Sequence, residues 1–509
     1  MNSRLMLAVL ASATLALTSC TSTDSTNTPR AGSAGTNIDG LRLGNFLDLT
    51  SWDPAQSDIG FESVYLSAVY DPLIALTPSG KPRPALATHW TLSRDHRRLA
   101  LTLRRGVTFS DGSPFDAAAA AANLEHLRTG TASAPTYAAV DSITTKGTNT
   151  VVLHLTHPDN ALLYFMGLGR SYMVSPNALN KPSLAQHPVG SGPYLLSDRS
   201  RPGAEYDFSR RPHYWDSAAY PFKTVTIMPI VDFTARNNAM LSGQINAEYT
   251  DDTGYVEAKR QGWNIAQKAS NWVGLQITDH EGIRVKALAD TRVRRAINYA
   301  FDGPAILKSI GKNHGSPASQ VFPVGSPAYI ASLNTTYSYN VTKAKSLMAA
   351  AGYPNGFTVT MPMTPILQRY QAVTEQSLNA IGIRIKWINM SQADFQTKAS
   401  NYPMFNAVLA MHNQPAATVQ AQLTSPMWYN NSPTYTSHQD LKALVDRMNA
   451  SNSENGSLSA ARELNRELVK DAWFDVWYQS TNIYVSLPGI KITPVRGMMF
   501  PTLRYITKN

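Results

Sequence analysis

The sequence predicts a mixed α/β protein with two or more domains. Its 509 residues are too many for one hydrophobic core, because cores stop growing at roughly 250–300 residues. In the first half, predicted strands and helices alternate irregularly, which is typical of α+β packing. In the second half, residues 340–388 run helix, strand, helix, strand, which predicts an α/β domain.

The first 36 residues predict an export signal and a tether. Arg4 precedes an apolar run, 5–17, that fits a signal peptide but is too short to span a bilayer. We expect residues 1–20 to be this signal, and 21–36, rich in Ser, Thr, Gly, Asn and Pro, to be a flexible tether. The segment that ends at Cys20 resembles the lipobox of bacterial lipoproteins, which implies that this cysteine carries acyl chains. The alternative is an ordinary signal peptide with an incidental cysteine.

Alternating apolar and polar residues predict the strands of the first half. The pattern covers residues 98–109 and 151–155, and a further strand is expected over 41–46, where the globular part begins. Asp111 and Gly112 predict a turn after the strand over 98–109. Ser113 as N-cap and Pro114 at the first helical position then predict an alanine-rich helix over 115–127.

Glycines divide the elements of the second half. A helix predicted over 343–351 closes at Gly352, and a second over 368–381 closes at Gly382. Strands are predicted after each helix, over 357–361 and 383–388. Because one helix separates the two strands, we expect them to be parallel with a right-handed crossover. Amphipathic helices are also predicted over 291–301 and 458–477.

The composition fits a globular protein and does not favour nucleic acid as a partner. Hydrophobic residues make up 43% of the chain, charged residues 16%, and the net charge is +10. The basic residues are scattered, and the densest cluster, Arg292, Arg294 and Arg295, lies on a predicted helix. Such a surface is either simply solvated or favours anionic lipid headgroups.

The chain shows no motif that predicts catalysis. The sequence lacks a nucleophile elbow, a phosphate-binding lysine loop and a zinc-protease helix. Residues 190–192 (GSG) come nearest to a nucleophile elbow but do not have its G-x-S-x-G spacing. The eleven histidines are dispersed, and Cys20 has no second cysteine with which to form a thiolate cage. We therefore predict no enzyme, no resident cofactor and no metal site.

Aromatic residues point to a binding cleft instead. The chain has nine Trp and 23 Tyr, and in 426–431 Trp428 and Tyr429 stand beside two asparagines. Rings supply contact area and amides supply orientation, so this loop is a candidate for the lining of a ligand cleft. The alternative is that both rings pack beneath a long connection.

A series of motifs, in order along nearly the whole chain, resembles one family. They are 52–55 (WDPA), 70–73 (YDPL), 84–90 (PALATHW), 103–117 (LRRGVTFSDGSPFDA), 189–194 (VGSGPY), 210–215 (RRPHYW), 241–247 (LSGQINA), 290–297 (DTRVRRAI) and 349–357 (AAAGYPNGF). The chain is similar to the dipeptide- and oligopeptide-binding lipoproteins of ABC importers, the extracellular solute-binding proteins of family 5.

The resemblance implies a bilobal, periplasmic-binding-protein-like fold with two interlobe crossings. Lobe I, of mixed α+β structure, would comprise 37–271 and 481–509, with 58–187 as an inserted subdomain, and the α/β lobe II would comprise 272–480. The implied function is that of a lipid-anchored, monomeric, extracytoplasmic protein at the cell membrane. It would capture a peptide or peptide-like solute and deliver it to ABC permease subunits. A sensor or adhesion lipoprotein, and a nickel or metal-chelate binder using His412 or His438, are the alternatives.

One departure from the family concerns the solute. In peptide-binding relatives, an aspartate just after a strand like 407–410 pairs with the α-amine, but here 411–415 reads MHNQP and the next acid is Asp440. A free amine is therefore in doubt unless Asp58 meets it, because a buried ammonium needs a carboxylate. We expect the cleft to be lined by Gln56, Ser57, Asp58 and Ser191 of lobe I and by Met361, Met363, His412, Asn413, Gln414, Trp428 and Tyr429 of lobe II.

Overall fold

The computed structural model describes residues 38–451 and 453–509. The predicted signal peptide, the tether and Cys20 lie outside these residues. Among the described residues, no helix is both long and apolar enough to cross a membrane.

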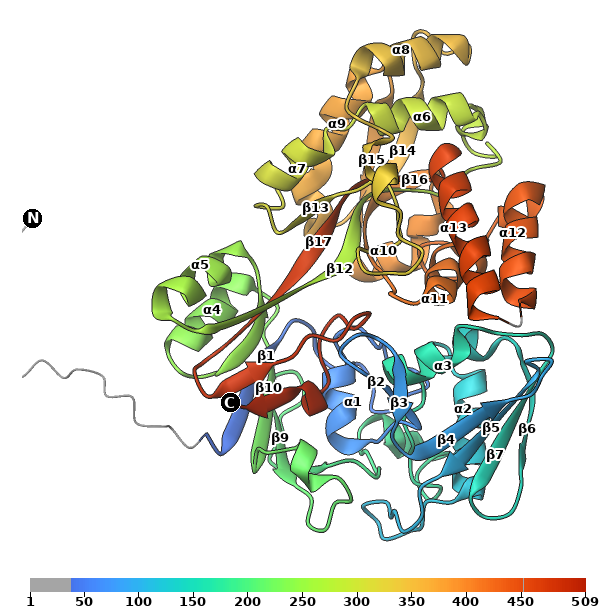
Figure 1. The fold of residues 1–509 in the computed structure, drawn as a ribbon. Helices are drawn as coiled ribbons and strands as arrows, with labels where there is room; N and C mark the ends of the chain where they lie inside the picture. The colour runs from blue at the N-terminus through green and yellow to red at the C-terminus, as the bar shows by residue number, and fades with distance from the viewer. Residues whose placement is uncertain (1–37, 452) are drawn as a thin grey trace, which may run out of the picture. The chain divides into compact units, whose positions relative to one another are not determined.

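A nine-stranded sheet runs through the described chain (Figure 1). Its order is β16-β12-β17-β11-β1-β10-β9-β8, and β13 pairs with β17 beside this path. Strand β1 is parallel to β10 and β11, whereas the other pairs are antiparallel. The strands are β1 (Gly40–Asn45), β8 (Tyr194–Leu196), β9 (Tyr206–Arg210), β10 (Thr224–Pro229), β11 (Ala247–Thr250), β12 (Asn264–Ile277), β13 (Gly315–Pro317), β16 (Met404–Ala410) and β17 (Phe474–Ser486).

Two long strands connect the two halves of this sheet. Strands β12 and β17 pair from Asn264 opposite Ser486 to Gln276 opposite Phe474, with register shifts after Ala269 and Val273. One end of β17 pairs with β11, and the other end of β12 pairs with β16. The expected crossings, at 271/272 and 480/481, fall within these strands. We keep the names lobe I for 38–271 with 481–509 and lobe II for 272–480, as our interpretation of the division.

Lobe I carries a second sheet, of order β4-β5-β7-β6, with helix α2 (Ala117–Thr129) beside it. Its strands are β4 (Ala87–Leu92), β5 (Arg98–Leu103), β6 (Val140–Thr145) and β7 (Thr150–Leu155), and Leu99, Leu101 and Leu103 of β5 are buried as their alternation predicts. The predicted start of α2 is wrong by two residues. The Asp116 side chain caps this helix by accepting from Ala119 N, whereas the Ser113 hydroxyl donates to Asp111.

The other α-helices and strands of lobe I (38–271 with 481–509) are four helices and two short strand pairs. The helices are α1 (Ser63–Val69), α3 (Leu162–Phe165), α4 (Phe233–Leu241) and α5 (Asp252–Gln261). Two short strand pairs complete it, β2 (Ile74–Leu76) with β3 (Pro82–Pro84) and β18 (Ile490–Ile492) with β19 (Ile506–Lys508).

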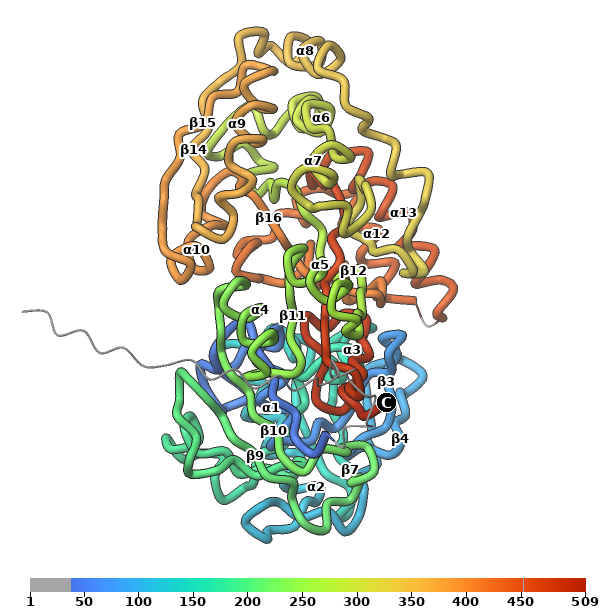
Figure 2. Tube along the Cα trace, turned by 90° about the vertical axis from the view of Figure 1, so that its left-hand side faces the viewer, coloured from blue at the N-terminus to red at the C-terminus, as the bar shows by residue number. Residues whose placement is uncertain are grey.

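Lobe II contains the predicted β-α-β unit. Strand β14 (Thr358–Met363) is parallel to β15 (Arg384–Asn389), and helix α9 (Gln371–Ala380) connects them beside β15 (Figure 2). A short helix, η7 (Pro365–Tyr370), occupies the predicted first turn of α9. The other helices of lobe II are α6 (Thr291–Tyr299), α7 (Gly303–Ser309), α8 (Val341–Ala350), α10 (Gln392–Lys398), α11 (Pro415–Val419), α12 (Gln439–Ala450) and α13 (Glu454–Lys470).

The helix predicted over 458–477 is wrong at its C-terminal end. Helix α13 ends at Lys470, and Ala472 has a positive φ of 46° that turns the chain away. Residues from Phe474 onward belong to β17. The apolar run at the end of the predicted helix fits a helix or a strand equally well. Pairing with β12 makes it a strand.

Candidate functional site

His412 contacts lobe I just beyond the end of β16. Its ring is 7% exposed and lies edge-on to Tyr164 and Phe165 of α3, with centroid distances of 5.6 and 5.3 Å. Its Nδ1 lies 3.3 Å from the Tyr164 hydroxyl. Burial lowers the pKa of His412 to about 4, so the ring is neutral at pH 7.

The next two side chains also reach lobe I. Gln414 Nε2 donates to the Asn160 carbonyl at 2.9 Å, while its Oε1 accepts from Ala417 N and caps α11. Asn413 Nδ2 lies 3.5 Å from the Ser79 carbonyl. The structure therefore brings together the three consecutive residues predicted at the end of β16, at a point where both lobes meet.

Arg496, in the segment after β18, connects this point to lobe I. Its backbone N–H donates to the Pro78 carbonyl at 3.1 Å. Its Nη1 donates to Asn413 Oδ1 at 3.1 Å and to the Gly325 carbonyl at 3.0 Å, both in lobe II. A Cβ at Gly325 would lie 2.3 Å from this nitrogen, so only glycine admits the guanidinium there.

Lys268, on the crossing strand β12, lies beside the same segment. Its Nζ donates to the Val495 carbonyl. Burial, with a further contribution from Arg496, lowers the pKa of Lys268 to about 7.

A group of aromatic rings lies at the carboxyl ends of β1 and β11. Phe46, Phe61, Phe233 and Tyr249 are half-buried and lie within 6.3 Å of one another in successive pairs. Carboxyl ends of strands in open α/β sheets are common ligand positions. Burial raises the pKa of Tyr249, and the charge of Arg369 in η7 opposes this rise.

Four of the predicted lobe II residues lie elsewhere. Met361 and Met363 are 0% and 2% exposed in the hydrophobic core, because β14 is covered on that face. Trp428 is 37% exposed and contacts Phe395 and Phe405, at the far end of β16 from His412. The buried Tyr429 hydroxyl donates to the Ala421 carbonyl at 2.9 Å, which holds the loop together.

The residues of lobe I that were predicted at the cleft mostly contact other residues of lobe I. Ser57 is buried and its hydroxyl lies 2.6 Å from the Ser51 carbonyl, and Ser191 is buried where the backbone at 190–192 approaches Val69 and Tyr70. The exposed Asp58 accepts from Gly60 N, and its own N–H donates to Glu62.

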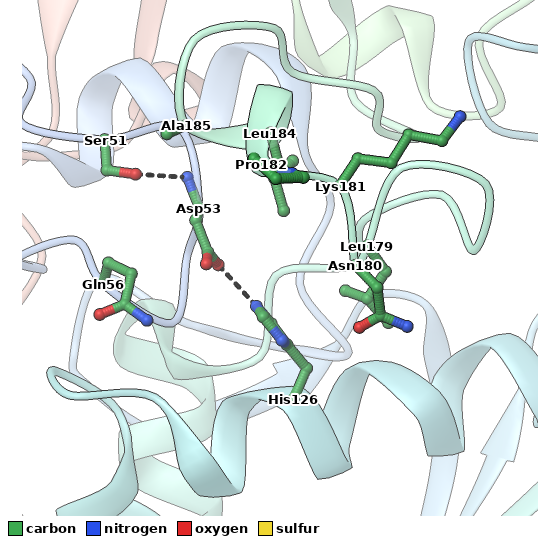
Figure 3. A pocket seen from close by; sticks show the side chains of 10 residues that line it. All are labelled: Ser51, Asp53, Gln56, His126, Leu179, Asn180, Lys181, Pro182, Leu184 and Ala185. Atoms are coloured by element: carbon green, nitrogen blue, oxygen red, sulfur yellow. Dashed lines mark hydrogen bonds and ion pairs between the residues drawn. The ribbon is translucent and has the colours of Figure 1, made fainter.

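Gln56 lies in a separate hollow of lobe I. This hollow, of about 370 Å³, is lined by Ser51, Asp53, Gln56, His126, Leu179, Asn180, Lys181, Pro182, Leu184 and Ala185 (Figure 3). Asp53 Oδ1 and His126 Nε2 are 2.8 Å apart beside Gln56. Gln56 accepts from the Thr131 hydroxyl, so its partner is also within lobe I.

The sequence reasoning missed Lys268, Arg496 and Tyr164. Lys268 lies in the half-buried first part of β12, where Gln267 beside it is exposed, so its position does not stand out. Arg496 and Tyr164 lie 83 and 248 residues from their partners at 413 and 412, so no local pattern marks them. Within the described part of the chain, no three His, Cys, Asp or Glu side chains are placed to hold a metal ion.

Comparison with known proteins identifies the family. The family model for bacterial extracellular solute-binding proteins, family 5 Middle, matches residues 81–443. The glutathione-binding protein GsiB of Salmonella choleraesuis is 28% identical over 357 residues, which cover 67% of each chain. GsiB of Escherichia coli O157:H7 is also 28% identical, over 355 residues, or 66% of this chain and 67% of that one.

Solved structures share the fold. DppA of Helicobacter pylori in complex with the peptide STSA has a TM-score of 0.79 at 21% identity, covering 92% of this chain and 98% of that one. AgaA from A.tumefacien R10 in complex with agropinic acid has a TM-score of 0.80 at 22% identity, covering 92% and 99%. NikZ of Campylobacter jejuni with Ni(L-His) has a TM-score of 0.76 at 18% identity, covering 92% and 100%. The chain belongs to the bacterial extracellular solute-binding proteins of family 5.

Proposed function

We propose that the protein captures a peptide or peptide-like solute between its two lobes and delivers it to the permease of an ABC importer. The observation that supports this most is the contact of His412 with Tyr164 and Phe165, because it joins lobe II to lobe I beside the two crossing strands. A solute that touches both lobes would favour the arrangement in which they meet, through its higher affinity for that arrangement.

The class of solute is inferred from the relatives and from the site. Relatives that are 28% identical to the chain are named for glutathione, and proteins of the same fold hold a peptide or agropinic acid. The half-buried rings Phe46, Phe61, Phe233 and Tyr249 offer apolar contact area. Such an area suits a small organic solute.

The decisive experiment is native mass spectrometry of the purified mature chain, which detects a solute that co-purifies. Thermal unfolding with peptides, glutathione, opines and nickel–histidine would follow. We expect at least one peptide-like solute to raise the melting temperature, since binding to the folded state stabilises it. If no solute class binds, the proposal is wrong.

Two alternatives share the binding step. A sensor or adhesion protein would bind the same solute without transport, and loss of solute uptake in a deletion strain separates transport from sensing. A metal-chelate binder is suggested by similar folds that hold Ni(L-His) and Fe(III)-EDTA. Stabilisation by nickel–histidine and by no peptide would favour that alternative.

We further propose that the protein is a monomer, held outside the cytoplasm by lipid on Cys20. Cys20 follows an apolar run and precedes a polar segment, which suits a lipid acceptor. A Cys20→Ala variant should leave the detergent phase in a phase-partition assay and keep the wild-type solute affinity. Retention in the detergent phase would exclude Cys20 as the anchor.

A further inference from the structure

Two cations meet where the C-terminal segment passes the crossing strands. Lys268 of β12 donates to the Val495 carbonyl, and the next residue along that segment is Arg496. Arg496 reaches Asn413 and Gly325 of lobe II with its side chain while its backbone is bonded to Pro78 of lobe I. The pair therefore lies at the junction of the two lobes.

The partners of both cations are neutral. They are two carbonyl oxygens and one side-chain amide. Across residues 38–451 and 453–509, no carboxylate lies within 4.0 Å of Lys268 or Arg496. Arg504, in the same C-terminal segment, is instead bonded to Asp216 at 2.5 Å.

Both cations keep unused hydrogen-bond donors. An ammonium has three N–H groups and a guanidinium five. In the described structure, Lys268 uses one bond and Arg496 uses Nη1 alone, so Nε and Nη2 of Arg496 have no protein acceptor. Lys268 and Arg496 are both half-buried, and an anion beside the two cations would be attracted to both.

We propose that Lys268 and Arg496 bind a carboxylate group of the captured solute, so that the protein selects acidic solutes over neutral ones. This assignment rests on the proposed function and adds the chemical class of the solute. A guanidinium matches a carboxylate with two parallel hydrogen bonds, and the ammonium adds a point charge. Asn413, already bonded to Arg496, fixes the orientation of the guanidinium.

The test is isothermal titration calorimetry with matched pairs of solutes. The probes are glutathione and its dimethyl ester, and trialanine and trialanine amide, with the wild type, Lys268→Met and Arg496→Gln. We expect each variant to weaken binding of the acid at least about tenfold and to leave binding of the ester or amide within about twofold.

Conservative and distant variants serve as controls. Lys268→Arg keeps the charge and should recover most of the affinity for the acid, whereas Arg496→Lys keeps the charge without the two parallel hydrogen bonds and should recover only part of it. The exposed Lys308 and Arg466 lie in α7 and α13, and Lys308→Met and Arg466→Gln should bind both forms like the wild type.

Three results overturn the assignment. The first is a wild type that binds the ester or amide as tightly as the acid. The second is a variant that weakens both forms equally, which would mean a structural role. The third is a variant that weakens neither form. These results leave the proposed function intact, whereas a wild type that binds no solute in either form would overturn the proposed function and this assignment with it.

Discussion

The Nδ1 atom of His412 lies 3.3 Å from the hydroxyl of Tyr164, and this contact joins lobe II to lobe I. The imidazole lies edge-on to the rings of Tyr164 and Phe165, and the Thr418 hydroxyl donates to the His412 carbonyl. Burial alone accounts for its lowered pKa, of about 4. The ring in this contact is therefore neutral at pH 7.

The first prediction is that acid weakens this contact. The pKa of His412 is lower in the folded protein than the ordinary 6.5, so its contribution to stability is present above pH 6.5 and is lost as the pH falls toward 4. Between pH 7 and pH 4 the free energy of unfolding should fall by about 3 kcal/mol from this group. Urea unfolding at both pH values measures it, and His412→Phe should remove this part of the pH dependence.

A histidine elsewhere provides the control for that experiment. His89, on β4, is exposed. A His89→Gln variant should keep the pH dependence of the wild type. If His412→Phe and His89→Gln behave alike, the buried imidazole is not the source of the acid sensitivity.

Local patterns predicted elements whose stability is decided within a few residues. Gly352 and Gly382 end α8 and α9 with φ values of 87° and 84°, conformations that glycine adopts without strain. The parallel pair β14 and β15 followed from the single helix between them. Start and end points were less predictable, because Asp116 competed with Ser113 for the cap of α2 and pairing with β12 claimed residues 474–477 for β17.

The site was less predictable than the fold, for a physical reason. His412, Asn413 and Gln414 were expected at the cleft and do lie where the lobes meet, because they directly follow a strand. Trp428 was expected at the cleft because its ring stands beside amides, but it packs on Phe395 and Phe405 instead. Met361 lies in the core, to which large apolar side chains are equally suited. The positions of Lys268 and Arg496 depend on how distant segments pack, which sequence spacing does not encode.

The second prediction concerns a buried ion pair beneath the aromatic rings of lobe I. Arg236 of α4 and Glu248 of β11 are fully buried, with Nε and Oε2 3.5 Å apart. Burial raises the pKa of Glu248 to about 7 even beside Arg236, so in Arg236→Met its carboxyl group would be buried, largely protonated and without a partner, which costs about 1–3 kcal/mol. Guanidinium chloride unfolding should show that loss.

An exposed pair is the matched control. Arg447 and Glu463 pair on the surface of α12 and α13, where water screens both charges. Arg447→Met should therefore change the unfolding free energy much less than Arg236→Met. If both variants lower the free energy of unfolding by the same amount, burial of the Arg236 pair adds nothing to the cost of breaking it.

The third prediction is that Trp428 supports the fold and does not bind solute. It contacts Phe405, which lies five residues before Ala410, or roughly 16 Å along the strand from the end that meets lobe I. Trp428→Ala should lower the free energy of unfolding by about 1–2 kcal/mol, because a half-exposed ring loses part of its packing. Solute affinity, measured by calorimetry, should stay within twofold of the wild type, and a tenfold loss would place the ring in the site.

The fourth prediction is that an acidic solute takes up a proton when it binds. The pKa of Lys268 is lowered to about 7 in the empty protein, so its side-chain amino group is about half protonated at pH 7. A carboxylate beside it favours the charged form and raises this pKa toward its ordinary value. Binding should then take up about half a proton at pH 7, and the affinity should fall as the pH rises above 7, by up to about tenfold per pH unit.

Calorimetry of glutathione binding in two buffers with different ionisation enthalpies measures the proton uptake. Lys268→Met removes the titrating group, so subtracting its value from that of the wild type isolates the contribution of the lysine from that of the solute. Equal uptake by both proteins would show that Lys268 does not meet the carboxylate.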